Sequence, residues 1–153
     1  MSKSLSNRKR GFAHERDLAR RLWEKGFAVM RAPASGSKAK RVVYPDVVAI
    51  MNGHVFAFEV KTTRTGEKTL YIHRDQVQKL VEFVRRSGGT AFIAVKIVGK
   101  GGWMFVPVKE LVETPGGNYK LSLGDMREGS FLRIDNLVAI ALGVRPLREF
   151  LKS

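Results

Sequence analysis

Two apolar, β-branched runs on either side of Asn52-Gly53 constrain the fold of this chain more than any other feature of its sequence. The first run extends from Val42 to Met51, and the second from Val55 to Val60. Asn-Gly favours the positive φ angles of a two-residue turn whose twist matches that of two antiparallel strands. The sequence therefore predicts a β-hairpin that closes at this turn.

The register of this hairpin places two carboxylates opposite each other. Counting outward from a two-residue turn pairs Ile50 with Val55 and, provided that no bulge intervenes, Asp46 with Glu59. Cross-strand partners point to the same side of a sheet, and the alternation of side chains brings Lys61 to that side too. Like charges in this position are destabilising unless something compensates them. Two interpretations stay open, a site for a hard divalent cation and a solvent-facing ion cluster.

A third carboxylate lies on the core side of the first predicted helix, residues 12–25. Glu15 is three residues from both Phe12 and Leu18, which places it in the apolar stripe rather than on the polar face. A carboxylate on that side needs a partner. That partner is either a structural salt bridge to the sheet or the same cation cluster.

The remaining pattern predicts one α/β domain with a central mixed sheet flanked by helices. The second helix, residues 74–86, has Val77, Leu80, Val81 and Val84 on its inward side and ends at Gly88-Gly89. Further strands are predicted at residues 27–31, 70–72, 90–95 and 103–106, a helical turn at 109–113, and a short helix at 132–142. Three parts are expected along the chain, namely a basic flexible arm at 1–10, a core domain at 11–113, and an extension at 114–153 that packs on or trails the core.

The charge favours a polyanionic partner. The chain has 28 Lys and Arg against 14 Asp and Glu, a net charge of +14, with 12 of the basic residues before position 42. Nucleic acid is the commonest such partner, although a merely soluble basic protein is the alternative. The chain has no cysteine, which excludes disulfides and thiolate metal sites. With no apolar run of membrane-spanning length, we expect a cytoplasmic, nucleoid-associated protein.

These residues fit metal-dependent hydrolysis of a phosphodiester bond. Asp46 and Glu59 would hold Mg²⁺, and Lys61 would place a positive charge near the attacking water or the developing phosphorane. The histidines, His14, His54 and His73, show no metal-ligand spacing.

Pro-Asp followed by Glu-Val-Lys on adjacent strands is the motif of the PD-(D/E)XK nuclease superfamily. Over about residues 9–106 the chain further resembles the archaeal Holliday junction resolvases, in the segments GFAHER at 11–16, GFAVMRAPASGS at 26–37, PDVVAI at 45–50, FEVK at 58–61 and RDQVQKLVEFVRRSGG at 74–89. The resemblance implies a restriction-endonuclease-like fold and a homodimer that cuts four-way DNA junctions with Mg²⁺, for which Mn²⁺ can substitute. The branch of the family stays open.

The resemblance also implies roles for individual residues. Its catalytic set matches Glu15, Asp46, Glu59, Lys61 and, near the basic loop at 32–41, Ser35, with Glu15, Asp46 and Glu59 as the metal ligands. The basic residues expected to bind DNA are Arg8, Lys9, Arg10, Arg16, Arg31, Lys38, Lys40 and Arg41. Phe83 on the second helix is either part of a dimer interface or an ordinary core residue. Two alternatives remain for the whole protein, a duplex-cutting restriction or repair nuclease and a non-catalytic junction-binding protein.

The C-terminal segment VRPLREFL, residues 144–151, has a spacing similar to the apolar part of peptides that dock on DNA sliding clamps (PCNA). Leu147, Phe150 and Leu151 would share one face of a helical turn. Val144 stands where such peptides carry glutamine. The alternative is a helical turn that closes the domain.

Overall fold

The computed structural model describes residues 2–33 and 42–143, with side chains from residue 12 onward. The Ser35 site and the Lys38, Lys40 and Arg41 contacts lie outside these residues, as does the clamp-docking segment with Leu147, Phe150 and Leu151. These assignments stay predictions.

The hairpin at Asn52-Gly53 has the predicted turn and register. Asn52 and Gly53 have φ angles of 51° and 78°, as the predicted turn requires. Strand β2, Val47–Met51, pairs antiparallel with β3, His54–Arg64, and the pairs include Met51 with His54 and Val47 with Phe58. Strand β3 runs four residues beyond the predicted Val60, to Arg64.

The hairpin is the centre of a five-stranded mixed sheet in the order β1-β2-β3-β5-β6. Its other strands are β1, Ala28–Arg31, β5, Thr90–Val98, and β6, Met104–Pro107. Only the pairing of β3 with β5 is parallel, and α2, Arg74–Ser87, lies in the connection between them. The central mixed sheet was predicted from the sequence and is confirmed.

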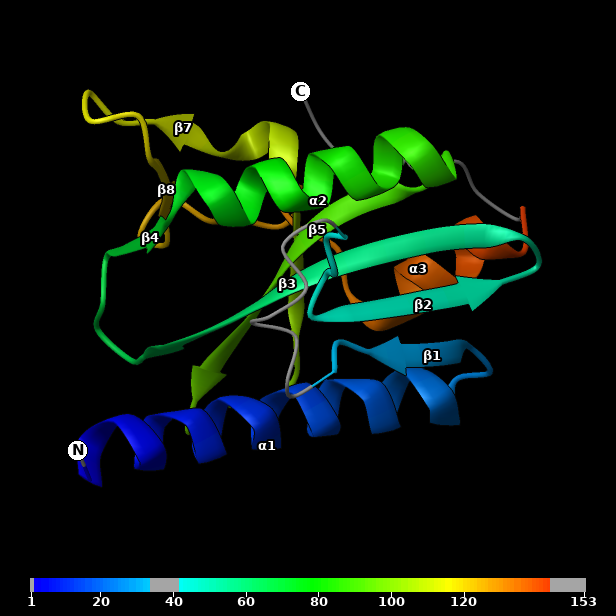
Figure 1. The fold of residues 1–153 in the computed structure, drawn as a ribbon, viewed down its shortest axis with the longest axis horizontal. Helices are drawn as coiled ribbons and strands as arrows, with labels where there is room; N and C mark the ends of the chain where they lie inside the picture. Colours follow the sequence, from blue (N-terminus) through cyan, green and yellow to red (C-terminus); the bar gives the residue numbers. More distant parts are fainter. Residues whose placement is uncertain (1, 34–41, 144–153) are drawn as a thin grey trace.

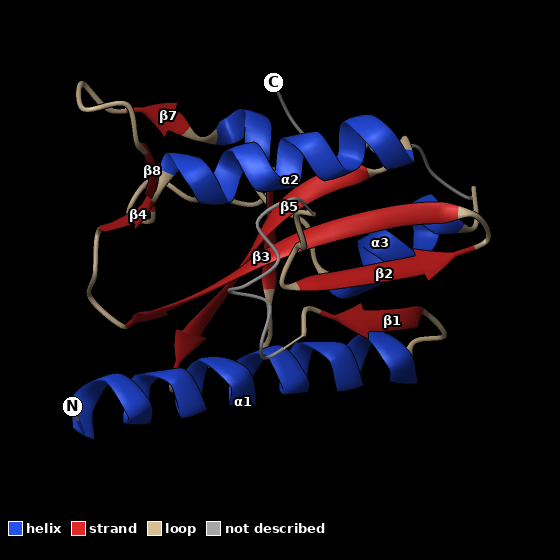
Figure 2. Cartoon of the chain, in the orientation of Figure 1, coloured by secondary structure: helices blue, strands red, loops and turns tan. Residues whose placement is uncertain are grey.

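Helices cover both faces of this sheet, so the molecule has three layers (Figures 1 and 2). Helices α1, Ser2–Glu24, and α3, Ile134–Ala141, pack on one face, where Leu18, Leu22 and Leu137 are buried against a cluster of phenylalanines. The rings of Phe58 and Phe105 in that cluster are 5.3 Å apart. Helix α2 packs on the other face through Val77 and Leu80.

Side-chain alternation along β3 decides which layer holds the site. Phe56 and Phe58 point to the α1 face, whereas Ala57 belongs to the α2 face. Glu59 and Lys61 continue the alternation of Ala57 and therefore lie on the α2 face. The carboxylate of Glu59 is thus placed between the sheet and α2, next to the apolar cluster that fills most of this layer.

The prediction of a flexible arm at residues 1–10 is corrected, because α1 begins at Ser2 and residues 2–10 are helical. Lys, Arg and Leu are good helix formers, and no proline interrupts the segment. The prediction failed because the segment lacks the apolar periodicity by which the rest of the helix was recognised.

The strand predicted at residues 70–72 belongs to a second sheet. Strand β4, Thr69–Ile72, pairs with β8, Tyr119–Ser122, which pairs with β7, Val112–Glu113. The helical turn predicted at 109–113 is the shorter 3-10 turn η2, Val108–Glu110. Strands this short, on either side of a Gly- and Asn-containing turn, give almost no alternation for a sequence pattern to detect.

Two further expectations are refined by packing. Val81, predicted to face inward, is 47% exposed. The buried stripe of α2 is narrow and consists of Val77 and Leu80. Residues 114–143, predicted as an extension, are integral to the packing, since Phe131, Leu132 and Leu137 are buried and Leu132 bridges to Phe105 in β6. None of the helices in the described residues has the length and apolarity needed to cross a membrane.

Candidate active site

Asp46 is held directly beside the hairpin ladder. It follows the buried Pro45 and precedes β2 by one residue. Its Oδ2 accepts a hydrogen bond of 2.9 Å from the backbone N–H of Val60. This bond holds the carboxylate against β3, next to the position that the hairpin register predicts.

Glu59 is a buried carboxylate with few hydrogen-bond donors. It lies in the middle of β3 and is 3% exposed. Its Oε1 accepts a hydrogen bond of 2.9 Å from Nε2 of Gln76. Its Oε2 is 3.4 Å from Nζ of Lys79, and no described residue donates a hydrogen bond to it. A buried, charged oxygen without a donor is costly unless another cation or a proton satisfies it.

The electrostatics of the site reflect this shortage. Burial, followed by the nearby negative charge of Asp46, raises the pKa of Glu59 to about 8, while Lys79 and Lys61 act in the opposite direction. Two carboxylates this close in a dry environment do not both ionise easily. The pair favours a site that takes up positive charge, as a proton or as a metal ion.

Glu15 extends this group of acids from α1. Its carboxylate lies 3.7 Å from the Arg31 guanidinium at the end of β1. Burial and then the charge of Asp46 raise the pKa of Glu15 to about 7, and Arg31 and Lys79 oppose that shift. Glu15 thus has the ion pair to the sheet that was one of its two expected partners, and its pKa also responds to the charge of Asp46.

The three predicted metal ligands do not form a closed set. Across residues 2–33 and 42–143, no three His, Cys, Asp or Glu side chains lie close enough together to hold an ion. Asp46 and Glu59 are brought together, and Glu15 is paired with Arg31. Lys61 is partly exposed on the same face of β3 as Glu59, and its positive charge favours the ionised form of Glu59.

Gln76 and Lys79 are contacts of Glu59 that sequence reasoning missed. Both lie near the N-terminus of α2, three residues apart and therefore on one side of the helix. Gln76 has a second contact, since its Oε1 accepts a 3.3 Å hydrogen bond from the backbone N–H of His73 at the helix cap. The available signal was a pair of polar residues flanking the buried Val77, but the sequence did not reveal which strand that side of α2 meets.

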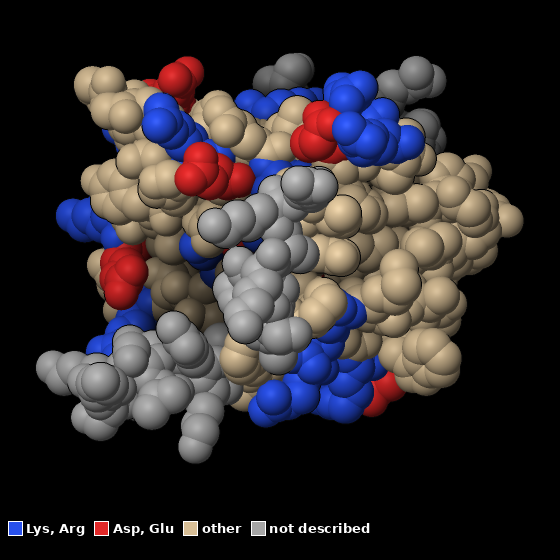
Figure 3. All heavy atoms as spheres, in the orientation of Figure 1, with Lys and Arg blue, Asp and Glu red and all other residues tan. Residues whose placement is uncertain are grey.

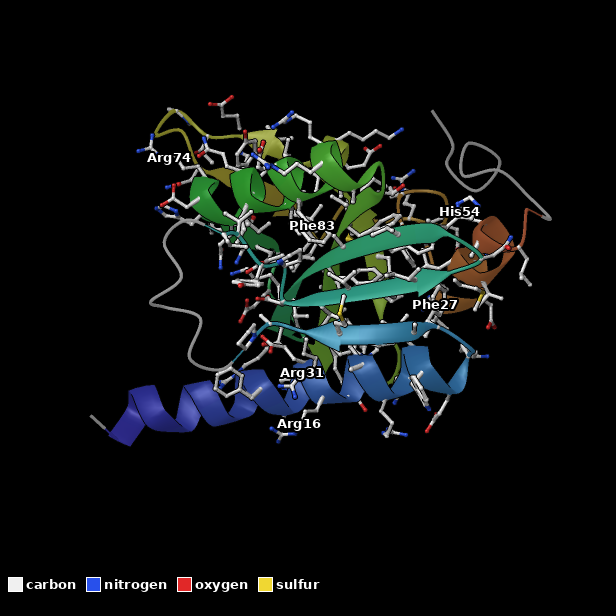
Figure 4. The ribbon with its side chains drawn as sticks, turned by 45° about the vertical axis from the view of Figure 1, so that its right-hand side comes forward. Arg16, Phe27, Arg31, His54, Arg74 and Phe83 are labelled. Carbon is white, nitrogen blue, oxygen red and sulfur yellow. The ribbon has the colours of Figure 1, made fainter. Side chains whose placement is uncertain are left out.

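The predicted DNA-binding residues are distributed over α1 and β1. Arg8, Lys9 and Arg10 lie on the N-terminal half of α1, and Arg16 is exposed one residue after Glu15. Figure 4 shows Arg16 and Arg31 on the side of the molecule formed by α1 and β1. On the face seen in Figure 3, Lys and Arg gather over the C-terminal half of α1 and the C-terminal end of α2. His54, at the hairpin turn, lies far along β3 from the site (Figure 4).

Comparison with known proteins gives consistent results. The profile of the archaeal Holliday junction resolvase (Hjc) family matches residues 6–141. The chain is 41% identical over 133 residues to "Crossover junction endodeoxyribonuclease Hjc" of Sulfurisphaera tokodaii, covering 87% of this chain and 88% of that protein. It is 40% identical over 139 residues to the protein of the same name from Sulfolobus acidocaldarius, covering 91% and 93%.

A solved structure agrees with the fold. The structure of Archaeoglobus fulgidus Hjc, described as a Holliday junction resolvase from an archaeal hyperthermophile, matches with a TM-score of 0.70 at 33% identity and covers 83% of this chain and 98% of that one. The matched residues 6–141 include the carboxylates of the site, the hairpin that pairs them and both helices that meet them. The chain belongs to the archaeal Holliday junction resolvase (Hjc) family.

Proposed function

We propose that this protein is a structure-selective endonuclease that resolves four-way DNA junctions by Mg²⁺-dependent phosphodiester hydrolysis, acting as a symmetric dimer. The observation that carries the proposal is the carboxylate pair of Asp46 and Glu59, in which a buried Glu59 oxygen has no hydrogen-bond donor among the described residues. The names of the relatives, which are crossover junction endodeoxyribonucleases, support the substrate.

The residues fit a hard divalent cation. Carboxylate oxygens are the ligands that Mg²⁺ prefers, usually one or two of them with several waters completing the octahedron. Asp46 and the Glu59 oxygen without a hydrogen-bond donor would supply two such ligands, and a positive ion between them would offset their mutual repulsion. Mn²⁺ accepts the same ligands and is expected to substitute. Bound there, the metal would supply activation of water and charge neutralisation at the phosphate.

The side chains divide the remaining work. The bond from Val60 N–H fixes the orientation of Asp46, and the amide of Gln76 fixes one oxygen of Glu59, so that the other oxygen is presented to a ligand. Lys61, on the same face of β3, would place its ammonium beside the phosphate, where negative charge develops during hydrolysis. Glu15 would act as the outer carboxylate, and Arg31, its ion-pair partner, is available to contact the DNA backbone.

An apolar groove beside α2 supports the proposed dimer. A cavity of about 520 Å³ is lined by Val42, Val43 and Phe83, with Glu82, Arg86 and Ser87 around them. Val42 is 56% exposed, and Phe83 lies on the side of α2 that faces the sheet (Figure 4). Phe83 is also partly buried against the core, which agrees with its interpretation as a core residue, and its role in a dimer interface stays a proposal. Symmetric cleavage of two strands requires two sites related by a two-fold axis, which a dimer supplies.

The rest of the basic surface would bind the arms of the junction. Arg8, Lys9, Arg10 and Arg16 on α1, together with Lys38, Lys40 and Arg41, remain in the proposal as contacts to the DNA, and Ser35 remains a proposed catalytic residue. Each phosphate contact releases counterions, so junction affinity should fall steeply as salt rises. Replacing Arg8, Lys9 and Arg10 with Ala should make the plot of log affinity against log salt less steep.

Cleavage assays on three substrates test the function. Labelled four-way junction, duplex and single strand are each incubated with Mg²⁺ or with EDTA, and we expect cleavage of the junction alone, in Mg²⁺ alone. Cleavage of duplex at an equal rate would identify a restriction or repair nuclease. Binding of the junction without cleavage in any metal would identify a non-catalytic binding protein.

A further inference from the structure

Asp17 is the most heavily bonded carboxylate in the described part of the chain. Its Oδ1 accepts a hydrogen bond from Arg20, and its Oδ2 accepts bonds from Arg21, Lys96 and Trp103 at 3.1, 3.2 and 3.0 Å. Arg20 and Arg21 are neighbours on α1 itself. The bonds from Lys96 and Trp103 are different, because they connect α1 to residues about 80 positions later in the chain.

The two distant donors lie on or next to strands of the central sheet, Lys96 in β5 and Trp103 directly before β6. Trp103 is 4% exposed and packs in the phenylalanine cluster, and Lys96 Nζ lies 5.6 Å from the centre of the Trp103 ring. Lys96 is on β5, where it pairs with Thr62 of β3, and its predecessor Val95 pairs with Lys61. Asp17 therefore attaches α1 to the sheet beside the strand positions that carry the site.

Glu15, two residues earlier on α1, has no comparable attachment of its own. Its ion pair with Arg31 spans 3.7 Å, longer than a hydrogen bond, and Arg31 is itself partly exposed. Leu18 and Leu22 bury α1 in the core, but apolar contacts are not directional and allow a helix to roll or slide by a fraction of an ångström. Hydrogen bonds to fixed donors restrict both movements.

We propose that Asp17 is a positioning residue for the active site: its bonds to Lys96 and Trp103 fix the roll and the axial position of α1, and thereby hold the Glu15 carboxylate in its position relative to the site. This inference rests on the proposed function of Glu15. A displacement of about 1 Å in a catalytic group can lower a rate by about a hundredfold, so an anchor two residues away has a measurable consequence.

A double-mutant cycle tests the inference. Single-turnover cleavage of a four-way junction, and the Mg²⁺ concentration giving half the maximal rate, are measured for the parent, Asp17→Ala, Glu15→Gln and the double variant. We expect Asp17→Ala to lower the rate by roughly ten- to a hundredfold and to raise the Mg²⁺ requirement. In the Glu15→Gln background, Asp17→Ala should have little further effect, because its target is already removed.

The outcomes distinguish the proposed catalytic role of Glu15 from the positioning role of Asp17. Unchanged cleavage by Glu15→Gln would overturn the role of Glu15 in the proposed function. A strong effect of Glu15→Gln, combined with an Asp17→Ala effect that is absent or equally large in both backgrounds, would overturn the positioning role of Asp17 and leave the proposed function intact.

Two matched variants guard against a purely structural explanation. Arg20→Ala removes an exposed partner of Asp17 but keeps both bonds to the sheet, and we expect parental cleavage. Asp17→Asn keeps an oxygen that can accept the Trp103 N–H. If Asp17→Ala unfolds too readily to assay, Asp17→Asn takes its place, and its cleavage rate should lie between the parental rate and the rate expected for Asp17→Ala. In Trp23→Phe protein, the single remaining indole N–H resonance in an NMR spectrum reports directly on that bond. Loss of the bond in Asp17→Ala with an unchanged cleavage rate would overturn the inference.

Discussion

Asp17, which is partly buried, and Glu59, which is buried, are both carboxylates that face the sheet, yet their surroundings are opposite. Asp17 accepts hydrogen bonds from four side chains, whereas Glu59 accepts one and has an oxygen without a described donor. Although burial by itself would raise the pKa of Asp17, the bonds from Trp103 and Lys96 hold it at about 2, while burial and Asp46 raise that of Glu59 to about 8. The fold completes the coordination of Asp17 and leaves that of Glu59 open.

The number of hydrogen-bond donors around a carboxylate therefore distinguishes a structural carboxylate from a functional one. A buried acid that the chain's own donors saturate stabilises the fold in its ionised form. A buried acid that the chain leaves short of donors is unfavourable in isolation and is retained where a ligand completes it. Substitutions at both sites test whether Glu59 is a carboxylate that a ligand completes and Asp17 one that the fold itself saturates.

The largest effect is expected from Asp46→Asn. The amide oxygen can still accept the Val60 N–H, so the geometry is kept, but the negative charge proposed to bind Mg²⁺ beside Glu59 is lost. We expect single-turnover cleavage to fall by about 10³-fold. Junction affinity measured in EDTA should be unchanged or tighter, because repulsion of the phosphates decreases. Full cleavage activity would contradict the assignment of the open carboxylate pair as the metal site.

Lys61→Ala and Lys79→Ala sharpen the comparison, since both lysines lower the pKa of Glu59. Lys61 is the lysine of the Glu-Val-Lys motif, whereas Lys79 lies outside the motif and forms the ion pair of 3.4 Å with Glu59. We expect Lys61→Ala to lower the turnover at saturating Mg²⁺ by about a hundredfold, since it would remove a charge placed at the phosphate. Lys79→Ala should leave that rate much closer to the parent.

The Mg²⁺ dependence gives the control for this pair. A cation bound beside Glu59 would replace the charge lost in Lys79→Ala, so the melting temperature of this variant should rise more on adding Mg²⁺ than that of the parent. Equal losses of turnover in both variants would mean that the two lysines serve only to balance the charge of Glu59.

The sequence predicted one half of the site well, because that half is local. A two-residue turn fixed the pairing of the hairpin, and the pairing placed Asp46 beside Glu59 and Lys61 on one face. The position of Glu15 in the core-facing stripe of α1 was also visible from spacing. Each of these inferences depends on a periodicity or a turn, and neither requires knowledge of how distant elements dock.

The other half depends on docking and was not predicted. Gln76 and Lys79 reach Glu59 only because α2 crosses the sheet at β3, and Asp17 meets Lys96 and Trp103 only because α1 lies across the ends of β5 and β6. The small sheet has the same origin, since β4 and β8 pair across about fifty intervening residues. Side-chain patterns give the inward face of an element but not the residues that it meets there.

A smaller effect, in stability, is expected from Glu59→Gln. The pKa of Glu59 is raised in the folded protein from 4.5 to about 8, so the folded state binds more protons than the unfolded state between these values. Stability in EDTA should therefore fall as pH rises from about 4.5 to 8 and then level off. Gln has no charge to desolvate, so the variant should lose this slope and should exceed the parent at pH 8 by on the order of 3 kcal/mol.

Urea unfolding at several pH values measures this difference. Adding Mg²⁺ should stabilise the parent and reduce its pH slope, while the variant should respond little. A parent slope that persists unchanged in Glu59→Gln would show that another group is responsible.

The smallest effect concerns Asp17→Asn at low pH, and it has the opposite sign. The pKa of Asp17 is lowered in the folded protein from 3.8 to about 2, so its contribution is complete above pH 4 and is lost as pH falls through about 2. At neutral pH we expect Asp17→Asn to be less stable than the parent by about 1–2 kcal/mol, and this difference should shrink as both proteins are acidified towards pH 2. Urea unfolding of both proteins at pH 7, 4 and 2.5 measures it. A difference that stayed constant down to pH 2.5 would show that the loss comes from packing of the amide and not from the charge of Asp17. The contrast with Glu59, whose replacement by its amide stabilises the protein, would then rest on the open carboxylate alone.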